Sequence, residues 1–230
     1  MSREESETPS ARPPTIHTVT FSEPVSLVGD LVRLDALTGS DVPELVTAAS
    51  DGELWTLGYT NVPRPDAMAA AVDAMLERHR SGQLTPWVAR RVDTGAVIGM
   101  TNFWAVDAEN RRVEIGGTWN AAGAQRSGTN TESKLLLLTH AFDTLDCIAV
   151  EFRTHFLNRQ SRAAIERLGA RLDGVLRSHK ISPDGTLRDT VVYSITAADW
   201  PAIRHELARR LRDRRPVDTP SVSARAATPR

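Results

Sequence analysis

The sequence predicts an α+β fold, in which helices flank a central mixed but mostly antiparallel sheet of about seven strands. Three segments with strand-like alternation follow one another closely within residues 85–120. Amphipathic helical segments precede them, and helices alternate with further strands after them. The chain has 230 residues, of which 40% are apolar and 25% charged, and this composition is typical of one soluble domain.

The two ends of the chain differ in composition from the part between them. Residues 1–24 and 214–230 are rich in proline and polar residues and lack apolar periodicity. We therefore expect two disordered tails around a folded domain at residues 25–213. The start lacks the basic and apolar regions of a signal peptide, and no apolar run approaches the roughly 18 residues that span a bilayer. Cys147 is the only cysteine, which excludes an internal disulfide, so we expect a cytoplasmic protein.

The charge pattern gives little reason to expect nucleic acid or a membrane as a partner. The net charge is −1, from 28 basic and 29 acidic side chains. The basic run at residues 204–215 is typical of a solvated helix face. The six histidines show no metal-ligand spacing, so no metal is predicted. The sequence leaves open whether the protein is a monomer or a homodimer.

The elements before the central strands have local signals. Residues 27–37 alternate apolar and polar positions as a strand does, with a turn at Gly29–Asp30. Ser40 is a candidate cap for the helix that follows. A second helix is expected at 64–82, where apolar residues recur at helical spacing up to Gly82.

The remaining elements alternate between strands and helices. The central strands are joined by short turns at 93–95 and 107–110, as in hairpins. Gly169 can end one later helix in a left-handed conformation. The predicted strands are 85–92, 95–106, 111–120, 147–156, 172–181 and 189–196, and the predicted helices are 129–145, 158–170 and 200–215.

The loop "QRSGTN", residues 125–130, joins a strand to a helix and has the composition of an anion site. Thr129 and Glu132 have the spacing of a capping box, which would start the helix at that point. Free N–H groups of a first helical turn attract anions, and Arg126 adds a positive charge. Gly128 has no Cβ, which would let a ligand approach the backbone. The loop lacks the nucleotide P-loop ending and the dinucleotide GxGxxG pattern, so a plain helix start remains the alternative.

The pattern Q-x-x-G-x-N after a strand, followed one strand later by "LNRQSRAAIERLGA", resembles the acetyl-coenzyme A-binding core of the GNAT acetyltransferase superfamily. The resemblance covers roughly residues 27–200. The ending "HKISPDGTLRDTVVYSI" resembles the RimJ/RimL-type branch, whose members acetylate protein N-termini, including those of ribosomal proteins. The resemblance implies the GNAT fold, with a sheet splayed between its fourth and fifth strands. The family motif ends in Gly or Ala where this chain has Asn130.

The resemblance also implies which residues meet acetyl-coenzyme A. Backbone amides from Arg126 to Asn130 would hold the pyrophosphate. The strand with Gly116 and Gly117 would carry a bulge, and one of its amides would face the thioester carbonyl. The implied coenzyme-binding residues are Trp119, Asn120, Gln125, Arg126, Ser127, Gly128, Thr129, Asn130 and Asn158.

Two residues are candidates for proton transfer. Glu114 lies on the central strand and could take the proton that an amine loses on attacking a thioester; alternatively, it is an ordinary polar strand residue. Many family members use a tyrosine to protonate the leaving thiolate, and here Ile165 occupies that position. Ser161 matches the serine that Rim-type members present toward the sulfur; alternatively, it caps its own helix.

The resemblance therefore implies an enzyme that transfers acetyl from acetyl-coenzyme A to a primary amine by direct attack. A protein N-terminal α-amine is the first expectation for the acceptor. Two alternatives remain, namely a small amine such as an antibiotic or polyamine, and a coenzyme-binding module without catalysis. The missing tyrosine favours the last.

Overall fold

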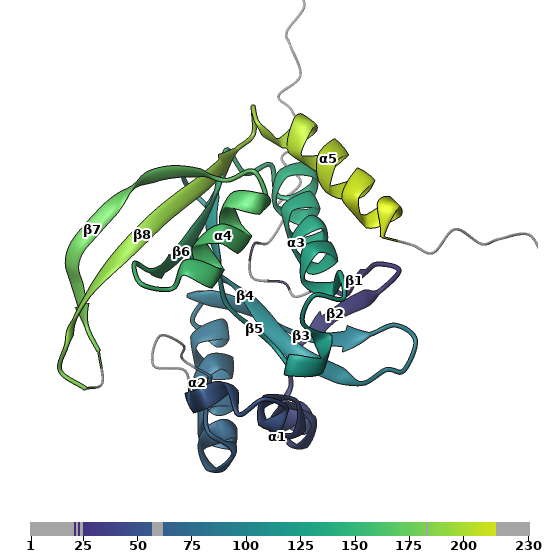
Figure 1. Cartoon of the computed structure of the whole chain (residues 1–230), viewed down its shortest axis with the longest axis vertical. Helices are drawn as coiled ribbons and strands as arrows, with labels where there is room; N and C mark the ends of the chain where they lie inside the picture. Colours follow the sequence, from purple (N-terminus) through teal and green to yellow (C-terminus); the bar gives the residue numbers. More distant parts are fainter. Residues whose placement is uncertain (1–20, 22, 24, 57–61, 183, 215–230) are drawn as a thin grey trace, which may run out of the picture.

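The computed structural model describes residues 21, 23, 25–56, 62–182 and 184–214. The expected tails at 1–24 and 214–230 lie outside this part of the chain except for Phe21, Glu23 and Arg214. Within it, eight strands form one sheet in the order β1-β2-β3-β4-β5-β6-β8-β7 (Figure 1). The β5–β6 pair is parallel and the other pairs are antiparallel, which confirms the predicted mixed, mostly antiparallel sheet.

The elements follow the predicted order, with one strand more than expected. The segment 27–37 turns back on itself, and Leu27 pairs with Leu34 across a turn closed from Gly29 N–H to Val32 O. The strands are β1 (Leu27–Val28), β2 (Val32–Ala36), β3 (Leu84–Arg91), β4 (Val97–Asp107), β5 (Arg112–Asn120), β6 (Ala149–His155), β7 (Arg171–Ile181) and β8 (Leu187–Thr196). The helices are α1 (Val42–Ser50), α2 (Met68–Arg80), α3 (Thr129–Thr139), α4 (Arg159–Arg167) and α5 (Trp200–Asp213).

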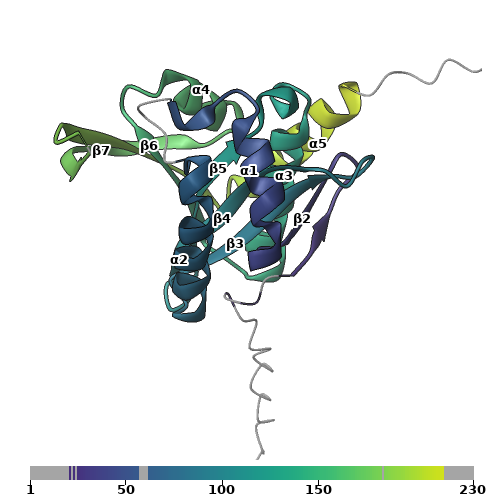
Figure 2. The same ribbon diagram turned by 90° about the horizontal axis from the view of Figure 1, so that it is seen from below.

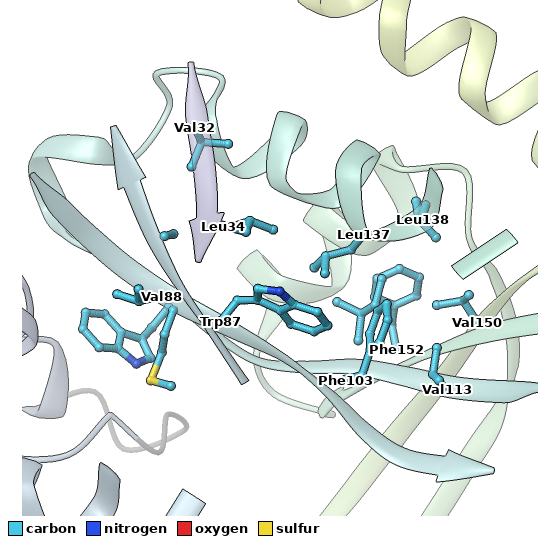
Figure 3. Close-up of a cluster of buried hydrophobic side chains, with 14 of the residues drawn as sticks. Val32, Leu34, Trp87, Val88, Phe103, Val113, Leu137, Leu138, Val150 and Phe152 are labelled. Atoms are coloured by element: carbon cyan, nitrogen blue, oxygen red, sulfur yellow. The ribbon is translucent and has the colours of Figure 1, made fainter. Parts of the chain in front are cut away.

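The helices cover the sheet in two layers. Helices α1 and α2 pack on β4 and β3 on one face, and α3 packs on β2 on the other face, with α5 alongside it (Figures 1 and 2). The core lies between the sheet and α3, where Leu137 and Leu138 meet strand residues such as Trp87 and Phe103 (Figure 3). The Trp87 and Phe103 rings meet edge to face at 5.0 Å. This core fixes α3, and therefore the loop before it, relative to β5.

The start of α3 differs from the predicted capping box. Gly128 is the N-cap residue, with a φ of +98°, and no cap side chain bonds the first turn. The Glu132 carboxylate instead accepts three main-chain N–H groups of the β1–β2 turn: Asp30 at 3.0 Å, Leu31 at 2.7 Å and Val32 at 2.8 Å. The capping-box prediction was wrong because a buried turn with three free donors binds the carboxylate more completely than one helix amide can.

Two other helix ends were predicted with mixed success. Ser40 is not the cap of the first helix, because Thr38 precedes the helical turn and its N–H and hydroxyl both donate to Asp41 at 2.8 Å. Gly169 does end α4 in the predicted left-handed conformation, with a φ of +97°. A Cβ there would lie 2.9 Å from Ile203 of α5, so the glycine also permits this helix contact.

Glu132→Gln is expected to lower the free energy of unfolding by about 2–3 kcal/mol, because an uncharged amide replaces a buried carboxylate that accepts three N–H groups. Urea unfolding followed by circular dichroism measures this change. Glu109→Gln makes the same chemical change on an exposed turn and should alter stability by less than about 0.5 kcal/mol. Equal stabilities of the two variants would contradict the role of Glu132.

Candidate active site

The sheet opens between β5 and β6. These parallel strands pair only at Arg112 with Ala149, Val113 with Val150, and Glu114 with Glu151. β5 continues to Asn120 without a β6 partner, which leaves a gap between the strands. The predicted splay between the fourth and fifth strands is therefore present, and it falls at β5 and β6 because β1 adds one strand to the count.

A bulge in β5 borders this gap. Gly116 pairs with Asn102 and Trp119 pairs with Met100, so Gly117 and Thr118 share one position opposite β4. Gly117 has a φ of +59°, and a Cβ on it would lie 2.4 Å from Asn102 Nδ2 and 2.8 Å from Trp104 Nε1. The predicted bulge is confirmed, and the conformation and crowding both require glycine at 117.

From the bulge onward, every second residue of β5 directs its main-chain N–H and C=O groups toward the gap. Ala121 N–H donates to Ile98 O of β4 at 2.8 Å. Because the bonding direction alternates along an antiparallel strand, Trp119 also faces β4, while Thr118 and Asn120 face the gap. The Trp119 side chain is packed in the core. An extended group lying in the gap can therefore pair with main-chain groups of Thr118 and Asn120.

The loop before α3 has main-chain N–H groups without hydrogen-bond partners at the Asn120 end of the gap. The main-chain N–H groups of Arg126, Ser127, Gly128, Asn130 and Thr131 donate to no residue that the structure describes. The hydroxyl groups of Ser127 and Thr129 hold the loop from within, since both donate to Ala124 O. Gln125 Nε2 donates to Asn120 O at 3.3 Å, which ties the loop to β5. Free amides at a helix start form an anion-binding site.

The structure gives Gly128 a different role from the expected one. The position of its missing Cβ faces the protein, 3.1 Å from Leu31 Cδ1 and close to Leu211 and Arg214 of the C-terminal region. Glycine is required at 128 by the positive φ and by this packing, not by close approach of a ligand.

Three arginines that the sequence analysis did not connect with the loop lie beside it. Arg167, Arg210 and Arg214 line a cavity of about 90 Å³ together with Asn130 and Thr131. Arg214 Nη1 donates to Arg126 O at 3.2 Å, and Arg210 Nη1 donates to Arg167 O at 2.5 Å. The run at 204–215 was expected to be a solvated face, but α5 packs along α3 and brings its last turn to the loop. The four-residue spacing of 210 and 214 was the available signal.

Glu114 lies on the opposite face of the sheet, beside Trp104 and a groove. Its side chain is 17% exposed, and Arg153 Nε is 3.6 Å from Oε2. Burial raises the pKa of the Glu114 carboxyl, and the charge of Arg153 opposes this effect. A groove of about 480 Å³ lies over β6, β8 and β7, and Arg153, Glu151 and Asp173 are among its lining residues, whereas Glu114 is not. Glu114 is thus a partly buried carboxylate with a raised pKa beside an arginine of the groove, and such a carboxylate is suited to accept a proton.

Asn102, on the same face, has an unused acceptor. The residue is 1% exposed, and its Nδ2 donates to Gly116 O at 3.3 Å. Its Oδ1 is buried and has no hydrogen-bond partner among the described residues. A buried unpaired oxygen next to Glu114 and the bulge is a candidate contact for a donor on a ligand.

The start of α4 faces the gap from the β6 side. Asn158 is the N-cap residue, and its Oδ1 accepts the Ser161 N–H at 2.9 Å. The Ser161 hydroxyl bonds no residue in the described part of the chain, so Asn158, not Ser161, caps this helix. Ile165, which stands where many family members have tyrosine, is buried in the core. The structure thus leaves the Ser161 hydroxyl available for a ligand.

No group of three or more His, Cys, Asp or Glu side chains in the described ranges is arranged to hold a metal ion. Across the same ranges, the helices are all too short or too polar to cross a membrane.

The described part of the structure thus combines a sheet that opens between two parallel strands with unpaired amides at a helix start on one face and a buried carboxylate on the other. The sequence profile of the "Acetyltransferase (GNAT) domain" matches residues 32–171, which is more than half of the chain. The protein belongs to this family.

Similar proteins agree with the resemblance to the RimJ/RimL-type branch. The "Putative ribosomal N-acetyltransferase YdaF" of Bacillus subtilis (strain 168) is 32% identical over 46% of this chain and 57% of its own length. The chain thus matches little more than half of that relative. A "putative acetyltransferase" from T. thermophilus has a TM-score of 0.72 and 31% identity over 82% of this chain and 98% of its own. Mycobacterium smegmatis RimJ in complex with CoA-disulfide shares the fold, with a TM-score of 0.70 and 21% identity over 82% and 96% of the two chains.

Proposed function

We propose that the protein transfers acetyl from acetyl-coenzyme A to a primary amine, and that the amine is a protein N-terminal α-amine. One observation carries the proposal: the free edge of β5 at Thr118 and Asn120 runs from the unpaired amides of the α3 loop to the bulge beside Glu114. A long ligand with an anionic group at one end and a reactive group at the other would fit along this edge. Membership of the acetyltransferase (GNAT) family favours acetyl-coenzyme A as that ligand.

The residues present fit the phosphates of such a ligand. The start of α3 has the free N–H groups of residues 126–128, 130 and 131 and, beside them, the guanidinium groups of Arg167, Arg210 and Arg214. The expected contacts with Gln125, Ser127, Gly128, Thr129 and Asn130 belong to this loop, and those with Asn120 and Asn158 belong to the gap. Trp119 was also expected to contact the coenzyme, but its main chain faces β4 and its side chain is packed in the core. When bound, the coenzyme supplies an activated thioester.

On the other face, the chain can prepare the amine. Glu114 takes a proton from the ammonium form, directly or through water, and its raised pKa makes it a stronger base. Asn102 Oδ1 accepts a remaining N–H and so directs the nitrogen lone pair toward the thioester. The Thr118 amide faces the carbonyl oxygen, on which negative charge develops. Ser161 donates a hydrogen bond to the departing thiolate.

The groove favours a peptide acceptor over a small amine. It is long and open and has both basic and acidic side chains, including Arg112, Arg153, Glu151 and Asp173. Such a groove can hold several residues behind a terminal amine, whereas a small amine would need a closed pocket. The presence of Glu114 and of a free Ser161 hydroxyl favours an active enzyme over a coenzyme-binding module without catalysis.

The direct experiment measures thiol release from acetyl-coenzyme A with two panels of acceptors, namely N-terminal peptides and small amines. The proposal expects release that depends on a free peptide α-amine. Release with small amines alone would reassign the acceptor, and coenzyme binding without release for any acceptor would support the non-catalytic alternative.

Arg214→Gln is expected to weaken acetyl-coenzyme A binding roughly tenfold, because it removes a cation beside the phosphate loop. The effect should shrink as the salt concentration rises. Titration calorimetry measures both. Arg212→Gln removes the same charge from an exposed position on α5 outside the cavity and should leave affinity within about twofold. Equal effects of the two variants would indicate general charge attraction instead of a site.

Glu114→Gln is expected to lower kcat by about 10²–10⁴-fold while acetyl-coenzyme A still binds, since the amide cannot accept the proton. Steady-state kinetics with a saturating peptide acceptor give kcat, and calorimetry gives affinity. Glu109→Gln makes the same change on an exposed turn outside the groove, so it is the matched control and should retain most activity. A Glu114→Gln variant with native turnover would assign the proton to another base.

Ser161→Ala is expected to lower kcat with little change in coenzyme affinity or melting temperature, because Asn158 supplies the helix cap. The loss should be smaller for an acetyl donor whose leaving thiol is more acidic, since that thiolate needs less help. Kinetics with the two donors test this dependence. A loss of affinity or stability instead would assign Ser161 a structural role.

A further inference from the structure

Lys134 of α3 is a buried amine without a counter-ion. The residue is 5% exposed, and its Nζ donates to Thr118 Oγ1 at 2.7 Å and to Thr101 Oγ1 at 3.2 Å. It forms no ion pair with a described residue. Burial lowers the pKa of the Lys134 amine to about 7. A buried charge with only hydroxyl partners is costly to the fold, so its presence calls for an explanation beyond packing.

The charged groups nearest along α3 and on β5 are engaged elsewhere. Glu132 binds the β1–β2 turn, and the His140 ring stacks on Phe103 at 6.1 Å. Burial also lowers the pKa of His140, which favours its neutral form. Glu114 lies on the opposite face of the sheet, beside Trp104 and Arg153. Burial alone lowers the pKa of Lys134, and no described residue places a compensating charge beside its amine.

The two hydroxyl partners differ in position. Thr101 lies on β4 and is buried, whereas Thr118 lies in the bulge of β5, where its main chain faces the gap. The two hydroxyl oxygens are 2.7 Å apart, so one donates to the other. An ammonium group only donates, so both oxygens accept from Lys134. Lys134 is therefore held directly behind the one bulge residue that presents its amide to the gap.

We propose that Lys134 is a positioning residue for acetyl transfer: its ammonium group fixes Thr118 and places a positive charge behind the amide that receives the developing oxyanion. This inference rests on the proposed function. Lys134 gains and loses no bond during the reaction. Negative charge forms on the thioester oxygen as the amine adds, and it leaves with the thiolate when the C–S bond breaks. A cation fixed near this oxygen in a dry interior favours the charged intermediate without any rearrangement.

The kinetic test compares Lys134→Met, which keeps the volume and removes the charge, with the native protein. We expect kcat to fall about tenfold or more at pH 6.5, less than the ~10²–10³-fold lost with a direct oxyanion donor. The native-to-variant ratio of kcat should approach one as the pH rises and Lys134 loses its proton. Glu114 and the acceptor amine titrate in both proteins, so their effects on kcat cancel in this ratio. A ratio independent of pH would overturn the proposal.

Variants at the two hydroxyls separate the proposed role from packing. Thr118→Val should lose about as much activity as Lys134→Met, with no further loss in the double variant, because both break the same link. Thr118→Ser should retain activity. Thr101→Val removes the other hydroxyl partner but keeps the Lys134–Thr118 bond, so it should lose less activity than Thr118→Val. Equal losses at 101 and 118 would indicate that Lys134 only supports the fold.

A measurement without turnover separates this inference from the proposed function. The infrared band of acetyl-coenzyme A labelled with ¹³C at the carbonyl reports how strongly the bound carbonyl is polarised. The native protein should shift the band to lower wavenumber more at pH 6.5 than at pH 9, and Lys134→Met should show a smaller shift at both. That result without any acetylated acceptor would support Lys134 and refute the transferase. Equal shifts in both proteins, or no bound coenzyme, would refute the inference.

Discussion

The end of pairing between β5 and β6 after Glu114 and Glu151 is the constraint on which the site depends. Had the parallel ladder continued, the main-chain groups of Thr118 and Asn120 would have been used by β6 and closed to a ligand. The bulge fixes the divergence of β5 from β6, because Gly117 is an extra residue in β5 that has no partner in β4. Asn102 and Trp104 fill the space at the bulge, so the strand cannot straighten without losing packed contacts.

The gap needs a rigid frame, since two unpaired strand edges would otherwise close on each other. Helix α3 supplies it from one face: Leu137 and Leu138 anchor it in the core, and Glu132 binds the β1–β2 turn. Helix α5 completes the frame by packing on α3 and placing Arg214 on the carbonyl of Arg126. The same contacts that hold the gap open therefore also bring cations to the unpaired amides of the α3 loop.

Local features of the site could be predicted from the sequence, and distant contacts could not. The bulge at Gly116–Gly117 and the left-handed Gly169 depend on neighbouring residues and were predicted correctly. Glu132 looked like half of a capping box, because nothing local reveals three free amides about a hundred residues away in the chain. Arg210 and Arg214 looked like a solvated face, since the docking of α5 depends on Leu207 and the α3 surface. Lys134 reads as an ordinary helix lysine until the fold buries it.

β5 separates two opposite charges that would neutralise each other if they met. Glu114 lies on the groove side of the strand, and Lys134 lies behind it on the α3 side. On one face they would form an ion pair, which would lower the pKa of the carboxyl and raise that of the amine. Glu114 would then be a weaker base, and its carboxylate would neutralise the charge of Lys134. Because the strand separates the two groups, burial raises the pKa of Glu114 and lowers the pKa of Lys134. In the proposed site, β5 thus has a carboxylate that can accept a proton on one face and a cation on the other.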